Sequence, residues 1–183
     1  MGVAPGLAAL GAKAPDFALE GTDGRTYRLA DVRGGGATLV TFICNHCPYV
    51  QAVLDDIVRD AAELQSLGVG VIAIMPNDTK SYPADSFDNM KRLAEAKRFP
   101  FPYAIDRTQE VARAYGAVCT PDFFGFNGDL ELQYHGRIFA VRSLQRIAGS
   151  RRDLFEAMTE IARTGKGPTE QLSSMGCSIK WRG

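Results

Sequence analysis

Two cysteines separated by two residues offer the clearest chemistry in this sequence. The string Cys44-Asn45-His46-Cys47 stands between an apolar, β-branched run and an amphipathic segment that begins at Pro48. The unpaired backbone N–H groups of a first helical turn and the positive end of the helix dipole favour a thiolate over a thiol. We therefore predict that Cys44 is a thiolate nucleophile. Cys47 follows about one helical turn later, where it can close a small disulfide with Cys44 or resolve a mixed disulfide.

The same spacing also occurs in zinc sites and in pairs of buried structural cysteines. The second half of a metal site is missing, because Cys119, Cys177 and His135 do not form another close pair. Redox chemistry is therefore the preferred interpretation. Binding of a soft ion such as copper, or of zinc, stays open as an alternative.

The segments around this motif predict the elements that position it. Residues 38–43 are typical of a strand buried on both faces, and apolar residues recur at three- and four-residue spacing from Val50 to Leu64, as in an amphipathic helix. A second buried strand over 69–74 completes a βαβ unit. Further predictions are hairpins over 16–29 and 123–134, a helix from Asp85 or Ser86 to about Lys97, short elements at 103–105 and 109–115, and a last helix over 153–163.

Three landmarks resemble the thioredoxin-like superfamily, specifically its redoxin branch related to alkyl hydroperoxide reductase and thiol-specific antioxidant proteins. They are Ala14-Pro15-Asp16-Phe17, the C-x-x-C after the first buried strand, and Cys119-Thr120-Pro121 before the hairpin over 123–134. One subgroup of these redoxins has similar C-N-H-C-P-Y, C-T-P-D-F and C-terminal G-C-S-I-K-W strings.

The resemblance implies an α/β thioredoxin fold, with a central mixed sheet, helices on both faces and an N-terminal β-hairpin. The expected divisions are a flexible lead-in over 1–12, the redoxin domain over 13–163 and an extended C-terminal tail over 164–183 that packs on the domain. A cis bond between Thr120 and Pro121 is also implied. Thr120, Pro121 and Asn45 are then the expected substrate-binding residues.

The resemblance also bears on the type of redox chemistry. His46 is similar to the histidine of oxidising C-P-H-C proteins, which implies a hydrogen bond to the nucleophilic thiolate and a potential less reducing than that of a thioredoxin. Thr38 stands where thioredoxins keep a buried acid, so no general base is assigned for Cys47. Thr41 and Cys44 match the peroxiredoxin pattern but Ala37 replaces its proline, which disfavours peroxide activation without removing a thiol peroxidase as an alternative.

Two further cysteines are candidate third thiols. Cys119 stands two residues before Pro121, so it could approach Cys44, although burial at a strand edge is the simpler interpretation. Cys177, Ile179 and Trp181 alternate, which predicts an extended segment with one apolar face on the domain. Asp122 is interpreted as a solvated surface residue and His135 as exposed and without a role.

Composition limits the choice of partners. Lys+Arg and Asp+Glu are both 21, so the formal net charge is zero and neither nucleic acid nor an anionic membrane is favoured as a partner. No secretory signal or membrane-spanning run is recognisable, so we expect a cytoplasmic protein. We predict a thiol–disulfide oxidoreductase without a cofactor other than its Cys44–Cys47 pair. It would act on protein or small-molecule disulfides and thiols, as a monomer or homodimer.

Overall fold

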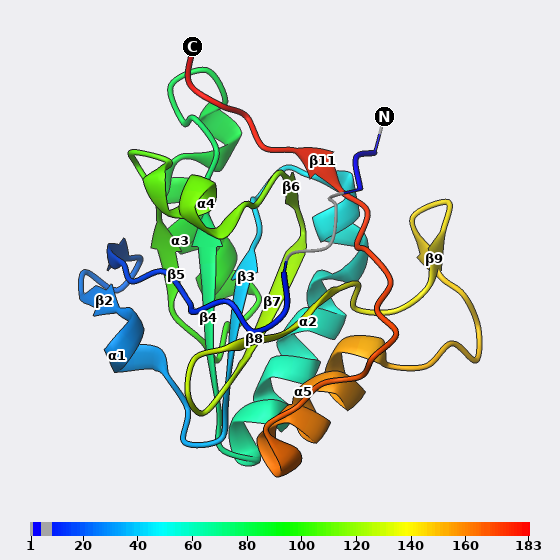
Figure 1. Ribbon diagram of the computed structural model, residues 1–183. Coiled ribbons are helices and arrows are strands. Elements are labelled where there is room, and N and C mark those ends of the chain that lie inside the picture. The colour runs from blue at the N-terminus through cyan, green and yellow to red at the C-terminus, as the bar shows by residue number, and fades with distance from the viewer. Residues whose placement is uncertain (1, 5–8) are drawn as a thin grey trace.

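The computed structural model describes residues 2–4 and 9–183 (Figure 1). The predicted lead-in over 1–12 therefore lies partly outside the described residues. Within the described part, Val3 forms an isolated bridge with Gly176, and the backbone N–H of Gly11 donates to the Leu132 carbonyl at 2.7 Å. These residues thus contact both the C-terminal tail and the edge of the domain.

A seven-stranded mixed sheet forms the centre of the molecule, in the order β2-β1-β5-β4-β3-β7-β8. Strands β3, β4 and β5 are mutually parallel and the outer pairings are antiparallel. The strands are β1 (Ala18–Gly21), β2 (Thr26–Arg28), β3 (Ala37–Phe42), β4 (Val69–Met75), β5 (Tyr103–Ile105), β7 (Asp122–Asn127) and β8 (Leu132–Gly136). The βαβ unit and both hairpins predicted from the sequence are confirmed.

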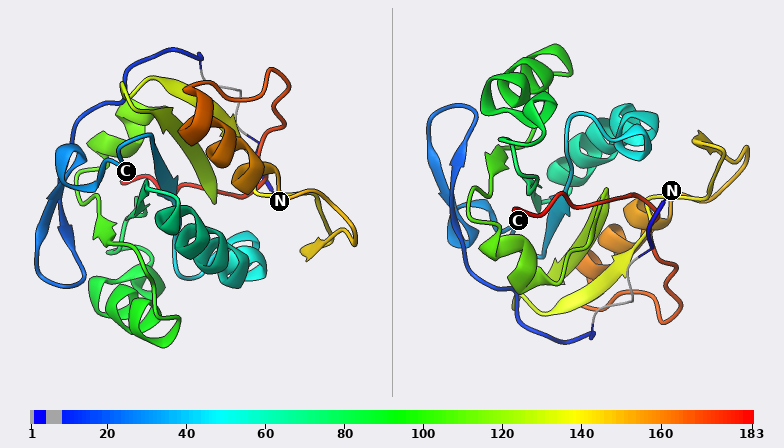
Figure 2. Two further views of the ribbon diagram at one scale, coloured as in Figure 1. Left: turned by 90° about the horizontal axis from the view of Figure 1, so that it is seen from below. Right: turned by 90° about the horizontal axis from the view of Figure 1, so that it is seen from above.

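Helices cover both faces of this sheet, as predicted (Figure 2). One face, which has the larger buried cluster, carries α2 (Pro48–Ser66), α3 (Phe87–Ala96) and α5 (Asp153–Thr164). The opposite face carries α1 (Leu29–Val32) and α4 (Glu110–Tyr115). A short 3-10 helix, η1 (Pro83–Asp85), precedes α3. Because side chains of a strand alternate between faces, Leu39 of β3 packs under α2 while Val40 and Phe42 pack toward α4.

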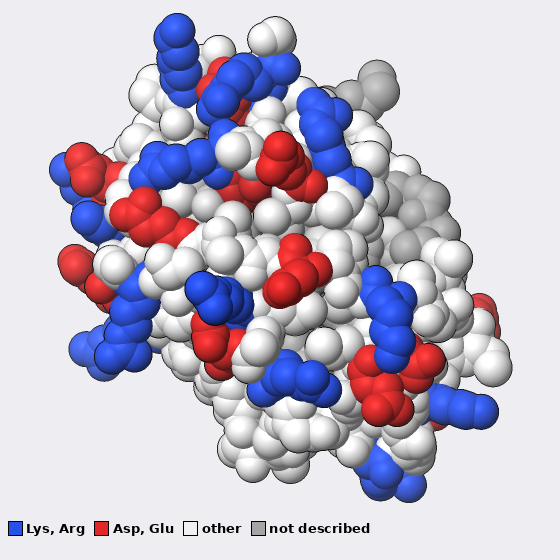
Figure 3. Space-filling view, turned by 60° about the vertical axis from the view of Figure 1, so that its left-hand side comes forward, with Lys and Arg blue, Asp and Glu red and all other residues white. Residues whose placement is uncertain are grey.

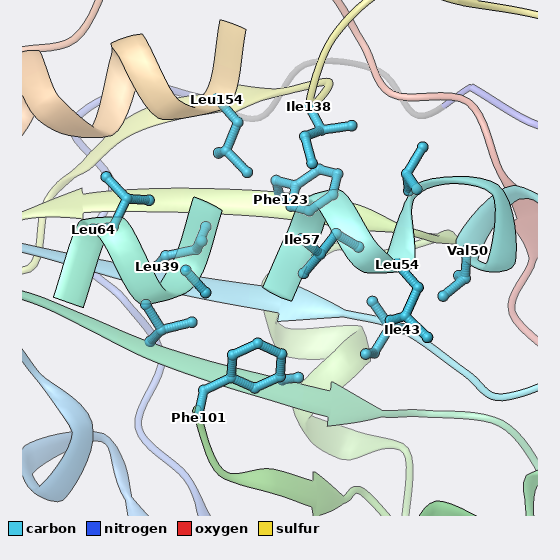
Figure 4. Close-up of a cluster of buried hydrophobic side chains, with 14 of the residues drawn as sticks. Leu39, Ile43, Val50, Leu54, Ile57, Leu64, Phe101, Phe123, Ile138 and Leu154 are labelled. Atoms are coloured by element: carbon cyan, nitrogen blue, oxygen red, sulfur yellow. The ribbon is translucent and has the colours of Figure 1, made fainter. Parts of the chain in front are cut away.

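The apolar stripe of α2 fixes the start of that helix against the end of β3. Figure 4 shows Val50 and Leu54 of α2 close to Ile43, the residue that follows β3. These three side chains are almost completely buried. Burial of a Leu, Ile or Val side chain contributes about 1.5 to 3 kcal/mol, so the strand-to-helix junction that carries the C-x-x-C is held firmly.

Two small antiparallel pairs lie outside the main sheet. One is the hairpin of β9 (Val141–Arg142) and β10 (Gln145–Arg146); the other pairs β6 (Cys119–Thr120) with β11 (Cys177–Ser178). Seen from above, the tail that carries β11 crosses the molecule near the end of β3 (Figure 2, right). In this tail Ile179 is buried and Trp181 is partly buried against the core.

Surface charge agrees with the neutral composition. On the face shown in Figure 3, Lys and Arg side chains are interspersed with Asp and Glu side chains. Within the described residues, none of the helices is both long enough and apolar enough to span a bilayer.

Candidate active site

The two cysteines of the motif lie at the junction of β3 and α2. Cys44 follows the strand and Cys47 is the N-cap residue of α2, and both side chains are almost completely buried. Cys44 Sγ lies 3.3 Å from Thr120 Oγ1, and Cys47 Sγ lies 3.2 Å from the Thr120 carbonyl oxygen. All four cysteines of the chain are unbridged thiols in this structure. A reduced dithiol therefore faces the strand that precedes Pro121.

The two thiols interact, and this shifts their pKa values in opposite directions. The hydrogen bond with Cys47, burial and the nearby Asp85 carboxylate all raise the pKa of Cys44. The hydrogen bond from Cys44 lowers the pKa of Cys47 to about 5, against burial; backbone N–H groups of Val50 and Cys177 also favour its thiolate. These shifts oppose a thiolate on Cys44 and favour one on Cys47, while the Thr120 hydroxyl beside Cys44 lowers the pKa of Cys44.

Asp85 accepts hydrogen bonds from the loop between the two cysteines. The backbone N–H groups of Asn45 and His46 donate to Asp85 Oδ1, at 2.8 and 3.2 Å. The Asp85 carboxylate, rather than the Cys44 sulfur, is the acceptor for these two amides. The helix itself begins only at Pro48, so its first-turn amides reach Cys47 instead.

Asp85 is the site residue that sequence analysis missed. It is fully buried at the end of η1, and its Oδ2 accepts a hydrogen bond of 2.9 Å from Asn77 Nδ2. The sequence offered Asp85 and Ser86 as alternative helix caps. The Ser86 hydroxyl caps α3 by accepting from the Asn89 backbone N–H at 3.2 Å, which leaves Asp85 available to the active-site loop. Only one of these two adjacent residues can cap the helix, and this was the sequence signal that could have pointed to another role for Asp85.

The polar side chains within the motif contact the protein itself. His46 Nδ1 lies 2.5 Å from Asp85 Oδ2, and the half-exposed ring stacks on Tyr82. Among the described residues, no hydrogen bond joins the imidazole to Cys44 Sγ. Asn45, predicted to bind substrate, instead accepts from the Tyr103 hydroxyl at 2.8 Å and donates to the Ala84 carbonyl at 3.1 Å. These side chains hold the loop in place.

The Thr120–Pro121 peptide bond is cis, in agreement with the resemblance. The backbone of Thr120, expected to dock an extended substrate, is paired with the chain's own tail through the register Cys177↔Thr120. On another side, Pro121 lines a cavity of about 280 Å³ together with Tyr49, Phe123 and Phe139. An apolar group therefore has space beside the proline, whereas a pairing strand has none while the tail is bound.

Two sequence-based interpretations near Pro121 are wrong. Asp122 and His135 are both buried, and His135 Nε2 lies 2.8 Å from Asp122 Oδ1, because the antiparallel β7–β8 pairing brings both residues inside.

Cys119 is buried with its Sγ 3.8 Å from the Pro121 carbonyl oxygen, and burial raises its pKa. Thr41 donates to the Asp122 carbonyl at 3.0 Å, so its hydroxyl hydrogen is not available to an oxygen on Cys44.

A set of three different donor atoms also meets here. One ligand atom each of Cys44, His46 and Asp85 lies within 4.8 Å of the other two. Sulfur, nitrogen and oxygen donors at this separation suit a borderline ion such as zinc. The set comes from the same loop and carboxylate that position the dithiol.

Comparison with known proteins gives relatives of two kinds. Over 118 residues the chain is 31% identical to the thiol-disulfide oxidoreductase ResA of Geobacillus thermodenitrificans, a match that covers 63% of this chain and 62% of that protein. The crystal structure of an uncharacterized conserved protein from Geobacillus kaustophilus is 43% identical with a TM-score of 0.94, covering 100% of this chain and 97% of that one. The tail is thus within the shared architecture.

The thioredoxin fold is supported by a more distant structure. The thioredoxin domain of a thiol-disulfide oxidoreductase from Bacteroides vulgatus superposes with a TM-score of 0.59 at 16% identity, covering 70% of this chain and 89% of that one. At this identity the likeness shows the fold alone. The AhpC/TSA family model matches residues 10–138, which is more than half of the sequence, and the chain belongs to that family.

Proposed function

We propose that this protein is a thiol–disulfide oxidoreductase that uses Cys44 and Cys47 as its redox pair. The observation that carries the proposal is the buried dithiol at the start of α2, with both sulfurs against Thr120 and next to the cis Pro121. The similarity to the thiol-disulfide oxidoreductase ResA and the family membership support the same reaction class. The chain spans only 62% of that relative's length.

The shared proton suggests how the first exchange begins. When a substrate disulfide approaches, the Cys44 proton moves along the hydrogen bond to Cys47 Sγ, where the Thr120 carbonyl at 3.2 Å accepts the new S–H. The Cys44 thiolate then attacks one substrate sulfur, so a Cys44–substrate bond forms and the substrate S–S bond breaks. Cys47 acts here as the base for Cys44, and no separate base is assigned for Cys47. Thr120 Oγ1, 3.3 Å from Cys44 Sγ, orients the attacking sulfur.

The second exchange completes the reaction. Cys47 returns its proton to the substrate thiolate that has just left and attacks Cys44 Sγ. The Cys44–Cys47 disulfide forms and the second substrate thiolate leaves, so two electrons pass from the dithiol to the substrate. The reverse sequence oxidises a dithiol substrate. Low pKa of Cys47 stabilises the reduced pair, which supports the predicted potential less reducing than that of a thioredoxin, by a route other than His46.

A defined exchange assay tests the function. The protein is equilibrated in glutathione redox buffers and its Cys44–Cys47 disulfide is quantified by alkylation and peptide mass spectrometry. Turnover is followed with a fluorogenic glutathione disulfide and dithiothreitol as reductant. We expect Cys44→Ser to abolish turnover and Cys47→Ser to retain a mixed disulfide on Cys44. A native protein that neither forms the disulfide nor accelerates the exchange would contradict the proposal.

Metal binding is a second candidate, favoured by the Cys44, His46 and Asp85 donor set. Equilibrium dialysis of the reduced protein against Zn²⁺ or Cu⁺, with Asp85→Asn as the comparison, tests it: tight one-to-one binding that the variant loses would support a metal site. Peroxide reduction is tested separately by peroxide consumption in native and Cys44→Ser protein. Cytoplasmic location, the monomeric or dimeric state and the lack of a further cofactor stay predictions.

A further inference from the structure

The C-terminal tail occupies the strand edge next to the dithiol. Strand β11 pairs antiparallel with β6, so Cys177 stands opposite Thr120 and Ser178 opposite Cys119. The approach is close: a Cβ on Gly176 would lie 2.0 Å from the Thr120 carbonyl oxygen. Only glycine permits the backbones to come so near. The sequence Gly176-Cys177 therefore places one particular thiol against the active site.

Contacts beyond Cys177 hold the tail in this register. The Ile179 backbone N–H donates to Val118 at 2.9 Å, and the Lys180 N–H donates to Asn77 Oδ1 at 2.9 Å. Ile179 is only 3% exposed, inside the cluster that packs under α4. Asn77 also binds Asp85, so the same side chain anchors both the tail and the active-site loop. The position of Cys177 is thus set by the folded domain.

The pairing places Cys177 next to Cys47. Cys47 Sγ lies 3.2 Å from the carbonyl oxygen of Thr120, the residue opposite Cys177, and Cys177 packs against the buried cluster that contains Cys44 and Cys47. This proximity lowers the pKa of Cys47 and raises that of Cys177. Cys119, by contrast, has its Sγ directed at the Pro121 carbonyl. Exposure differs as well: Cys44 is 1% and Cys47 0% exposed, whereas Cys177 is only partly buried.

We propose that Cys177 is a third redox thiol that exchanges with Cys47, so that oxidising equivalents pass between the buried pair and a sulfur nearer the surface. The proposal rests on the redox function of the Cys44–Cys47 pair. In the exchange, the Cys177 thiolate attacks Cys47 Sγ of the Cys44–Cys47 disulfide. A Cys47–Cys177 bond forms and the Cys44–Cys47 bond breaks. Cys44 leaves as a thiolate and takes up the proton that Cys177 released, with no net transfer of electrons.

The charge distribution favours this exchange from the oxidised pair. In the reduced protein, burial, the hydrogen bond with Cys47 and its negative charge raise the pKa of Cys177 to about 11. Once Cys47 is in a disulfide, its charge is gone and only burial still opposes a Cys177 thiolate. An incoming thiolate can then attack Cys177 Sγ of the Cys47–Cys177 bond. That bond breaks, Cys47 leaves as a thiolate, and the incoming sulfur stays bound to Cys177 as a mixed disulfide.

Disulfide mapping in Cys44→Ser protein tests the proposal directly. The variant is oxidised with diamide, alkylated and digested, and its crosslinked peptides are identified by mass spectrometry. We expect an intramolecular Cys47–Cys177 disulfide as the predominant crosslink. It should be lost in Cys44→Ser/Cys177→Ser and kept in the matched control Cys44→Ser/Cys119→Ser. A Cys47–Cys119 crosslink, or Cys47 that stays a free thiol while Cys177 is blocked, would overturn the proposal.

A second measurement uses the native chain and separates the two proposals. In glutathione redox buffers we expect two isomers of the oxidised protein, Cys44–Cys47 and Cys47–Cys177, with the second lost in Cys177→Ser. Formation of the first isomer alone overturns the third-thiol role and leaves the oxidoreductase intact. Formation of neither isomer overturns both proposals.

Discussion

The carboxylate of Asp85 should control how readily Cys44 reacts. A carboxylate oxygen lies within 4.8 Å of Cys44 Sγ, and both side chains are almost fully buried. At 4.8 Å and an effective dielectric constant of about 20, two like unit charges repel by about 3.5 kcal/mol. The ring of His46, with its Nδ1 2.5 Å from the same carboxylate, offsets part of this repulsion. We assume that replacing the Asp85 carboxylate removes half of this repulsion from the Cys44 thiolate, on the order of 1.7 kcal/mol.

The perturbation is Asp85→Asn, which removes the charge but keeps an oxygen that can accept from the Asn45 and His46 amides. Because the carboxylate raises the pKa of Cys44, its removal should lower that pKa. A change of about 1.7 kcal/mol corresponds to roughly an 18-fold larger thiolate population at neutral pH. Nucleophilicity falls with pKa, with a Brønsted coefficient of about 0.4 to 0.5, so the exchange rate should rise by roughly fivefold.

The assay is best carried out in a Cys47→Ser background, where Cys44 titrates without its partner. The rate of reaction with a chromogenic aromatic disulfide is measured against pH, and peptide mass spectrometry assigns the adduct to Cys44. The Asp85→Asn profile should move to lower pH. Asp88→Asn is the matched control, since it removes the same charge from an exposed position at the start of α3. Identical profiles for Asp85→Asn and Asp88→Asn would refute the reasoning.

Three further outcomes follow from the buried groups around the site. With the pKa of Cys47 lowered to about 5, reduction of the Cys44–Cys47 disulfide between about pH 6 and pH 8 takes up one proton for two electrons. The midpoint potential of the pair should therefore fall by about 30 mV per pH unit. A fall of about 59 mV per pH unit in a glutathione titration would contradict this. His135→Leu leaves Asp122 buried without its imidazole and should lower the free energy of unfolding in urea by about 3 kcal/mol. Ile179→Ala should lower the free energy of unfolding in urea by about 2 to 5 kcal/mol and make the dithiol more accessible to alkylating reagents. An unchanged unfolding midpoint would show that Ile179 does not anchor the tail.

Local features of the sequence determined the framework of the site. Strands and helices follow from periodicities of two and 3.6 residues, and the Asn127-Gly128 turn specifies its hairpin, because these signals involve near neighbours in the chain. The βαβ unit around Cys44 and Cys47 and the packed tail were therefore predictable. The cis bond before Pro121 was available through the family resemblance rather than through any local pattern.

Contacts between distant segments decided the charge and accessibility of the site. Asp85 stands 40 residues from Asn45, yet it takes the amides that local reasoning assigned to the Cys44 sulfur. The pairing of Cys177 with Thr120 and the burial of Asp122 against His135 depend likewise on how the chain folds back on itself. A thiolate's energy depends on the donors, charges and solvent within a few ångströms, and those neighbours come from parts of the chain that only the folded protein brings together.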